Sequence, residues 1–139
     1  MPDPADIPSG FFISTATNNA IAAAPALGIG PSGFGSVTQG AGSGKATPVT
    51  LNAKAGVVTM NAASLAANTA IQFTMTNSAV SGTDVISVNQ GTGGTAGAYQ
   101  AHCVDVGANT AIFRIVNTSA GPLSEAVTLN FVVIDTTAA

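Results

Sequence analysis

The stretch GFGSVTQGAGSGKATPVTLNAKAGVVTMNAASLAA, residues 33–67, sets the pattern that the rest of the chain repeats. It predicts a short strand, a glycine-rich break and two further strands, at residues 36–39, 40–44, 48–53 and 56–60. Only residues 53–55 separate the last two strands, so we expect them to pair with each other. The small-residue stretch 62–67 is too short to form a stable helix by itself, and we expect a connection there.

Strand signals separated by turn residues continue to the end of the chain. Five further strands are expected, at residues 69–77, 84–89, 99–106, 110–117 and 126–135. Within the first of these, Ile71, Phe73 and Met75 alternate with polar residues, as in a strand with one buried face. The regular spacing predicts an all-β fold, namely a single antiparallel β-sandwich or jelly roll of about eight strands over residues 36–139.

The last strand carries the longest apolar face of the chain. Val127, Leu129, Phe131 and Val133 alternate along it, while Val132 and Ile134 make its end apolar on the other face as well. A strand that is apolar on both faces is normally covered on both. We therefore expect this strand to be central in its sheet or to meet a partner chain.

Residues 1–35 lack this strand pattern and are expected to form an extended N-terminal arm. Prolines interrupt the first ten residues, so neither a regular helix nor a central strand fits there. An apolar cluster follows, and an alanine-rich stretch at 18–27 fits a short helix. A frayed terminus is the alternative interpretation, but it would leave the apolar cluster in water. The expected contacts of the arm with a partner are Phe11, Phe12, Ile13, Ile21 and Leu27.

The composition excludes several classes of function. The chain has 3 Lys+Arg and 6 Asp+Glu, so 6% of its residues are charged, against about 25% in typical domains. With Lys45, Lys54 and Arg114 as its only permanent cations, it offers no basic patch for nucleic acid. No apolar run is long enough for a membrane-spanning helix. So few surface charges suit a protein whose surface is largely covered in an assembly.

Three motifs resemble sites of chemistry but fail on closer inspection. Residues 28–33 and 91–96 match the spelling of the dinucleotide-binding glycine motif, yet neither follows a strand and opens a helix. Residues 40–45 end in Gly-Lys, but a phosphate loop needs a glycine where Gln39 stands and Ser or Thr after the lysine. His102 and Cys103 are neighbours on a strand, so they point to opposite faces and form no joint site. We expect Cys103 to share its face with Asp105.

The remaining ionisable residues give no catalytic set. The acidic residues lie on different strands and turns, so only folding could bring two of them together as a glycosidase pair. Glu125 with Arg114 is expected at most to form a cross-strand ion pair. There is one histidine and one cysteine, too few for a zinc site. The sequence therefore predicts a non-enzymatic protein without cofactor or metal.

Three segments resemble a small β-domain found in structural proteins of tailed phages. The family pattern has a GSVTQ-type entry, a K-x-T-x-V-T-L-N strand, a G-x-I/V-T-M-N strand and an N-x-S-x-G-x-L-S-E-x-V-x-x-N-F close. The matching segments are FGSVTQGAGSGKATPVTLN (34–52), GVVTMNAASLAANTAIQFTMTNSAVSGTDVISVN (56–89) and FRIVNTSAGPLSEAVTLNFVVI (113–134). The resemblance covers about three quarters of the chain.

The resemblance implies a capsid decoration (cement) protein on the outer surface of the virion, made in the host cytoplasm. Its implied partners are the major capsid protein and further copies of itself, as a homodimer or homotrimer. A lone module with an arm fits this role better than a tail fibre, because no heptads or shaft repeats occur. The alternative is a receptor- or glycan-binding module of a tail or head fibre that uses the loops at 91–97 or 40–44.

Overall fold

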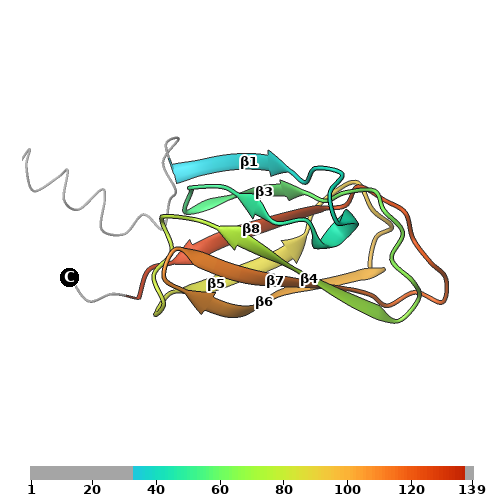
Figure 1. Ribbon diagram of the computed structural model, residues 1–139. Coiled ribbons are helices and arrows are strands. Elements are labelled where there is room, and N and C mark those ends of the chain that lie inside the picture. The colour runs from blue at the N-terminus through green and yellow to red at the C-terminus, as the bar shows by residue number, and fades with distance from the viewer. Residues whose placement is uncertain (1–32, 137–139) are drawn as a thin grey trace, which may run out of the picture.

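The computed structural model describes residues 33–136, which form a β-sandwich of two four-stranded sheets (Figure 1). Sheet A has the strand order β1-β3-β8-β5 and sheet B the order β2-β4-β7-β6. The strands are β1 (Phe34–Thr38), β2 (Val49–Thr50), β3 (Ala55–Thr59), β4 (Thr69–Thr76), β5 (Val85–Gln90), β6 (Tyr99–Gly107), β7 (Thr110–Asn117) and β8 (Thr128–Ile134). A 3-10 turn, η2 (Gly44–Ala46), precedes β2. The β-sandwich and its eight strands confirm the prediction.

The chain crosses from one sheet to the other at almost every connection. Among the described strands, only β6 and β7 are consecutive neighbours in one sheet. As a result, β1 pairs with β3 in parallel while β2 lies in the opposite sheet, and β2 pairs with β4 in parallel while β3 lies opposite. The expected pairing of the strands at 48–53 and 56–60 is therefore wrong.

The two parallel pairs also correct the expectation of a purely antiparallel sandwich. All other pairings are antiparallel. A jelly roll is assembled from antiparallel Greek keys, and this part of the prediction is not confirmed. A parallel pair needs a long crossover connection, which here is a strand of the opposite sheet.

The core lies between the sheets and is built from the inward faces of alternating strands. Phe73 and Phe113 of sheet B meet edge to face, with ring centroids 5.6 Å apart. Phe131 of sheet A packs against Phe113 at 5.8 Å, so three aromatic rings join the two sheets. Leu129 and Val133 are buried beside Phe131, as the alternation predicts. β8 is central between β3 and β5, which confirms one of the two expected positions.

The sandwich has two ends with different contents. We call the end where β1 begins and β8 ends the terminal end, at the left in Figure 1, and the opposite end the loop end.

Two buried asparagines hold the connections between strands, one at each end of the sandwich. At the terminal end, Asn77 Nδ2 donates to Ala53 O (2.7 Å) and Asn77 Oδ1 accepts from Ala53 N (3.1 Å). At the loop end, Asn117 Nδ2 donates to three carbonyls, those of Leu65, Ala66 and Gly121.

The stretch at residues 62–67 is not helical. Leu65 forms an isolated antiparallel bridge with Leu123, which ties this connection to the one between β7 and β8. The backbone N–H of each residue donates to the carbonyl of the other, at 2.9 and 3.0 Å. The expected connection at this end of the sandwich is therefore confirmed.

Candidate functional site

The residues predicted to contact a partner through the arm lie outside the described part of the chain. Phe11, Phe12, Ile13, Ile21 and Leu27 all precede residue 33. The structure neither supports nor contradicts their role, which stays a prediction. The candidate surfaces described below therefore belong to the sandwich.

Lys45 has a structural role at the loop end. Its Nζ donates to the carbonyl oxygens of Asn61 (2.6 Å) and Glu125 (2.5 Å), and the residue is 3% exposed. Burial lowers the pKa of Lys45, an effect that the nearby Glu125 charge partly opposes. The amine is thus used inside the fold, in agreement with the rejection of a phosphate loop.

The two glycine-rich loops at 40–44 and 91–97 lie at the same end and are linked through Glu125. Lys45, directly after the first loop, donates to the Glu125 carbonyl, and Thr95 Oγ1 of the second loop donates to the Glu125 carboxylate (3.1 Å). Tyr99 Oη donates to the same carboxylate (3.1 Å). Burial first, and then the bond and charge of Glu125, raise the pKa of Tyr99 to about 12.

His102 and Cys103 point to opposite sides of β6, as predicted. His102 is exposed, whereas Cys103 is half-buried and packs against the core. Burial raises the pKa of the Cys103 thiol, so the thiol is poorly ionised and a weak nucleophile. The expected common face of Cys103 and Asp105 is wrong, because a β-bulge between them turns Asp105 outward.

The outer face of sheet B brings together a polar row that we call the Arg114 row, consisting of Gln72, Arg114 and His102. Arg114 lies on the central strand β7, opposite Gln72 of β4 on one side and His102 of β6 on the other. Its Nε is buried and has no hydrogen-bond acceptor among residues 33–136. The expected ion pair with Glu125 is not formed, and both ion pairs found in the described part of the chain belong to Lys54.

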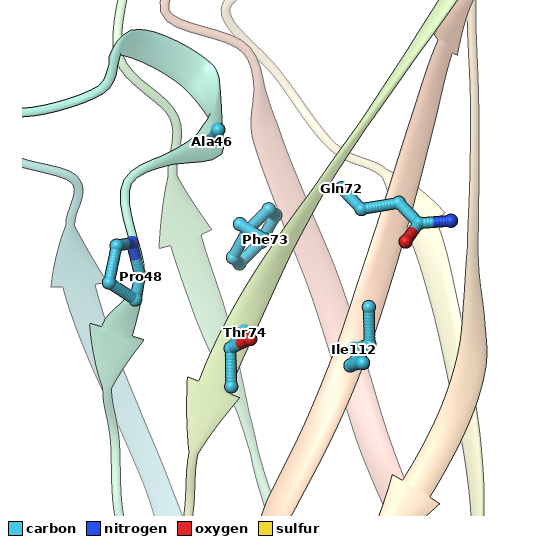
Figure 2. A pocket seen from close by; sticks show the side chains of 6 residues that line it. All are labelled: Ala46, Pro48, Gln72, Phe73, Thr74 and Ile112. Carbon is cyan, nitrogen blue, oxygen red and sulfur yellow. The ribbon is translucent and has the colours of Figure 1, made fainter.

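An open pocket of about 310 Å³ adjoins this row and shares Gln72 with it. Pro48 and Phe73 line it between the η2–β2 segment and β4, while Gln72 and Ile112 lie on the other side of the β4 ribbon (Figure 2). Ala46 and Thr74 complete the lining. The pocket thus has apolar walls, a hydroxyl and an amide, and the residue that carries the amide, Gln72, is the register partner of Arg114.

Neither a metal centre nor a membrane helix is found in the described residues. Within 33–136, no three His, Cys, Asp or Glu side chains are grouped so that they could hold a metal ion. Among these residues there is also no helix of the length and apolarity needed to cross a membrane. The ionisable side chains at the loop end bond mainly to backbone and hydroxyl groups rather than to one another.

Comparison with known proteins gave no match to a family model, to a curated protein or to a solved structure. The resemblance to phage β-domains therefore remains an inference from sequence motifs. The Arg114 row carries no sequence motif, because its three residues lie on separate strands at positions 72, 102 and 114. Only the strand register places them together.

Proposed function

We propose that this protein is a non-enzymatic virion component that decorates the outer surface of a phage capsid. The resemblance of residues 34–52, 56–89 and 113–134 to phage structural domains carries the proposal. The partners are the major capsid protein and, at a symmetry axis, further copies of the chain. The localisation is the outer surface of the virion.

Two features of the molecule support a structural role. Its side chains offer few mobile charges, because Lys45 is buried in a backbone-bonded site and Lys54 forms ion pairs with Asp84 and Asp135. β1 begins and β8 ends at the terminal end of the sandwich, so the chain enters the described fold opposite the loop end (Figure 1). A module of this shape can bind a capsid surface through one end and expose the other end to solvent.

The decisive experiment measures binding of the protein to capsids assembled without it. The full chain should bind saturably, with a copy number in proportion to that of the major capsid protein. A chain starting at Gly33 should remain folded and lose binding. A matched variant that replaces only the first ten residues with a Gly-Ser sequence keeps the apolar arm residues and should bind. Absence of saturable binding by the full chain, or a copy number typical of a tail component, would contradict the proposal.

A receptor- or glycan-binding role is the second candidate, and the Arg114 row favours it. A guanidinium flanked by an amide and an imidazole, beside a pocket, is suited to a saccharide that carries a carboxylate. The test is a glycan array with acidic and neutral sugars. Saturable binding to acidic sugars that Arg114→Gln abolishes and Lys54→Gln retains would support this role. Equal responses of the two variants would exclude this surface as the binding site.

A further inference from the structure

The outer face of sheet A is apolar at the terminal end. Val85 of β5 and Ile134 of β8 are register partners and are 54% and 41% exposed. In the next row along the sheet, Phe34 of β1 lies opposite Ala55, which in turn lies opposite Val132. Phe34 is 57% exposed. Ser87 of β5 completes this second row opposite Val132. We call the apolar members of the two rows, Val85, Ile134, Val132, Ala55 and Phe34, the apolar end of sheet A.

The other half of the same face is mainly polar, with the half-buried Val57 as its apolar member, so the exposed large apolar residues are segregated. Toward the loop end, Thr38 lies opposite Thr59, which lies opposite Thr128, and Asn89 lies opposite Asn130. Apolar residues scattered singly over a surface are ordinary, whereas connected apolar patches mark interaction sites. The segregation along one face therefore indicates a contact surface at the terminal end.

The fourth exposed large apolar residue of the described chain continues this surface around the sheet edge. Val104, 40% exposed, lines an open groove of about 430 Å³ together with Val85. Asp84 and Asp105 also border the groove. The Asp84 carboxylate already has partners. Lys54 Nζ lies 3.7 Å from it, and Ser81 donates hydrogen bonds to it from its backbone N (2.9 Å) and its Oγ (3.0 Å). Asp84 therefore does not require a cationic occupant, and the exposed Val85 and Val104 suit an apolar one.

The chain itself contains such an occupant. Thirty-two residues precede Gly33, and they enter the described fold next to Phe34, at the apolar end of sheet A. Within them, Phe11, Phe12 and Ile13 form an apolar cluster, and the stretch 1–32 contains no Lys or Arg. Twenty residues, 14–33, separate Ile13 from Phe34, a length that spans up to about 70 Å when extended and thus easily reaches the surface.

Tethering favours the same chain over a second copy as the source of this segment. A segment on a short flexible linker has an effective concentration in the millimolar range, far above the micromolar concentration of a typical protein solution. Closing a loop of this length costs little more than closing a shorter one. We propose that Phe11, Phe12 and Ile13 cover the apolar end of sheet A of their own chain when the protein is free in solution. On the virion, the proposed capsid contacts would compete for the same segment.

The test uses the purified full chain alone, so its outcome does not depend on the proposed virion role. The methyl NMR resonances of Val85, Val104 and Ile134 are compared between the natural chain and a variant with Phe11→Ser, Phe12→Ser and Ile13→Ser. We expect these resonances to shift, and the fluorescence of a hydrophobic dye to rise several-fold. The methyl resonances of Val116, on the outer face of sheet B, serve as the control and should not move.

A reciprocal variant changes the sheet residues and tests whether the arm residues respond. Val85→Ser with Ile134→Ser should shift the resonances of Phe11, Phe12 and Ile13, whereas Val116→Ser should leave them unchanged. Both responses should be independent of protein concentration. Unchanged resonances in both variants would overturn the proposal. A response that disappears on dilution, together with a doubled mass in light scattering, would assign the surface to a second copy and would equally overturn it.

Discussion

Lys45, Glu125 and Tyr99 join the connections at the loop end through hydrogen bonds that are partly buried, or exposed in the case of Thr95. Lys45 Nζ bonds to backbone carbonyls on two connections, and the Glu125 carboxylate accepts from hydroxyls at Thr95 and Tyr99. In a protein with 6% charged residues, these few ionisable groups are used inside the structure. Titration or substitution of any one of these groups should therefore change the stability of the fold measurably.

Tyr99 should ionise far above the ordinary range of a phenol. Its folded pKa is raised to about 12, against about 10 in an unfolded chain. Because the folded pKa is the higher one, the protonated Tyr99 phenol stabilises the fold. This stabilisation is complete below pH 10 and is lost as the pH rises from 10 to 12. Tyr99 is the only tyrosine and the chain has no tryptophan, so ultraviolet absorbance of the phenolate follows it directly. A midpoint near 10 in the folded protein would contradict this prediction.

Lys45 should matter more for stability than Lys54. Lys45→Met leaves two carbonyls without their donor and should lower the free energy of unfolding by about 1–3 kcal/mol. The matched variant Lys54→Met removes partly exposed ion pairs to Asp84 and Asp135, for which we expect less than about 1 kcal/mol. Urea unfolding of both variants measures the difference. Equal losses would show that the buried bonds of Lys45 add nothing beyond those of a surface lysine.

The strands β1 and β3 approach closely because two glycines face each other between them. Gly35 and Gly56 are register partners, and a Cβ placed on Gly56 would lie 2.3 Å from Gly35 O. Leu51 of the opposite layer fills the space beside them. The absence of side chains at this pair thus allows the edge strand β1 to bond to β3 while Leu51 packs against both.

Gly56→Ala should therefore loosen the β1 edge. The added methyl forces the backbone of β1 away, and we expect a loss of about 1–3 kcal/mol, as for overpacking. Gly40→Ala is the matched control, because no atom lies within 4 Å of a Cβ at that position. Hydrogen exchange of the β1 amides should accelerate in Gly56→Ala alone. Unchanged exchange and stability would show that the edge tolerates the methyl.

The molecule as a whole is held together by the aromatic contact between its sheets. Phe73 and Phe113 project from sheet B and Phe131 from sheet A, with exposures of 2%, 0% and 4%. The six strand pairings act within a sheet, whereas these rings and their aliphatic neighbours act between sheets. The core should therefore unfold as one unit.

Phe73→Ala should destabilise the whole sandwich by about 3–5 kcal/mol. Thr74→Ala offers a control on the same strand, because Thr74 is exposed on the outer face of β4, and surface changes of this kind usually stay within about 0.5 kcal/mol. Thermal and urea unfolding should give a single transition in both variants. A comparable loss in the two variants would contradict the assignment of Phe73 to the core.

The strands could be located from the sequence because the signal for them is local. Alternation along 69–77 and 126–135, and turn residues between the strands, act within a few residues, and all eight strands lie where these patterns predict them. The buried positions of Phe73 and Phe131 follow from the same alternation. The opposite orientations of His102 and Cys103 and the rejection of the phosphate loop at Lys45 could likewise be reasoned from neighbouring residues.

The pairing of the strands could not be read in this way, because it depends on contacts between distant segments. Nothing local in residues 33–67 shows that the chain crosses between sheets there, and so β1 with β3, and β2 with β4, form parallel pairs. The Arg114 row and the apolar end of sheet A also arise from register across strands far apart in sequence. Periodicity assigns a side chain to a face, whereas packing of the sheets decides which side chains share it.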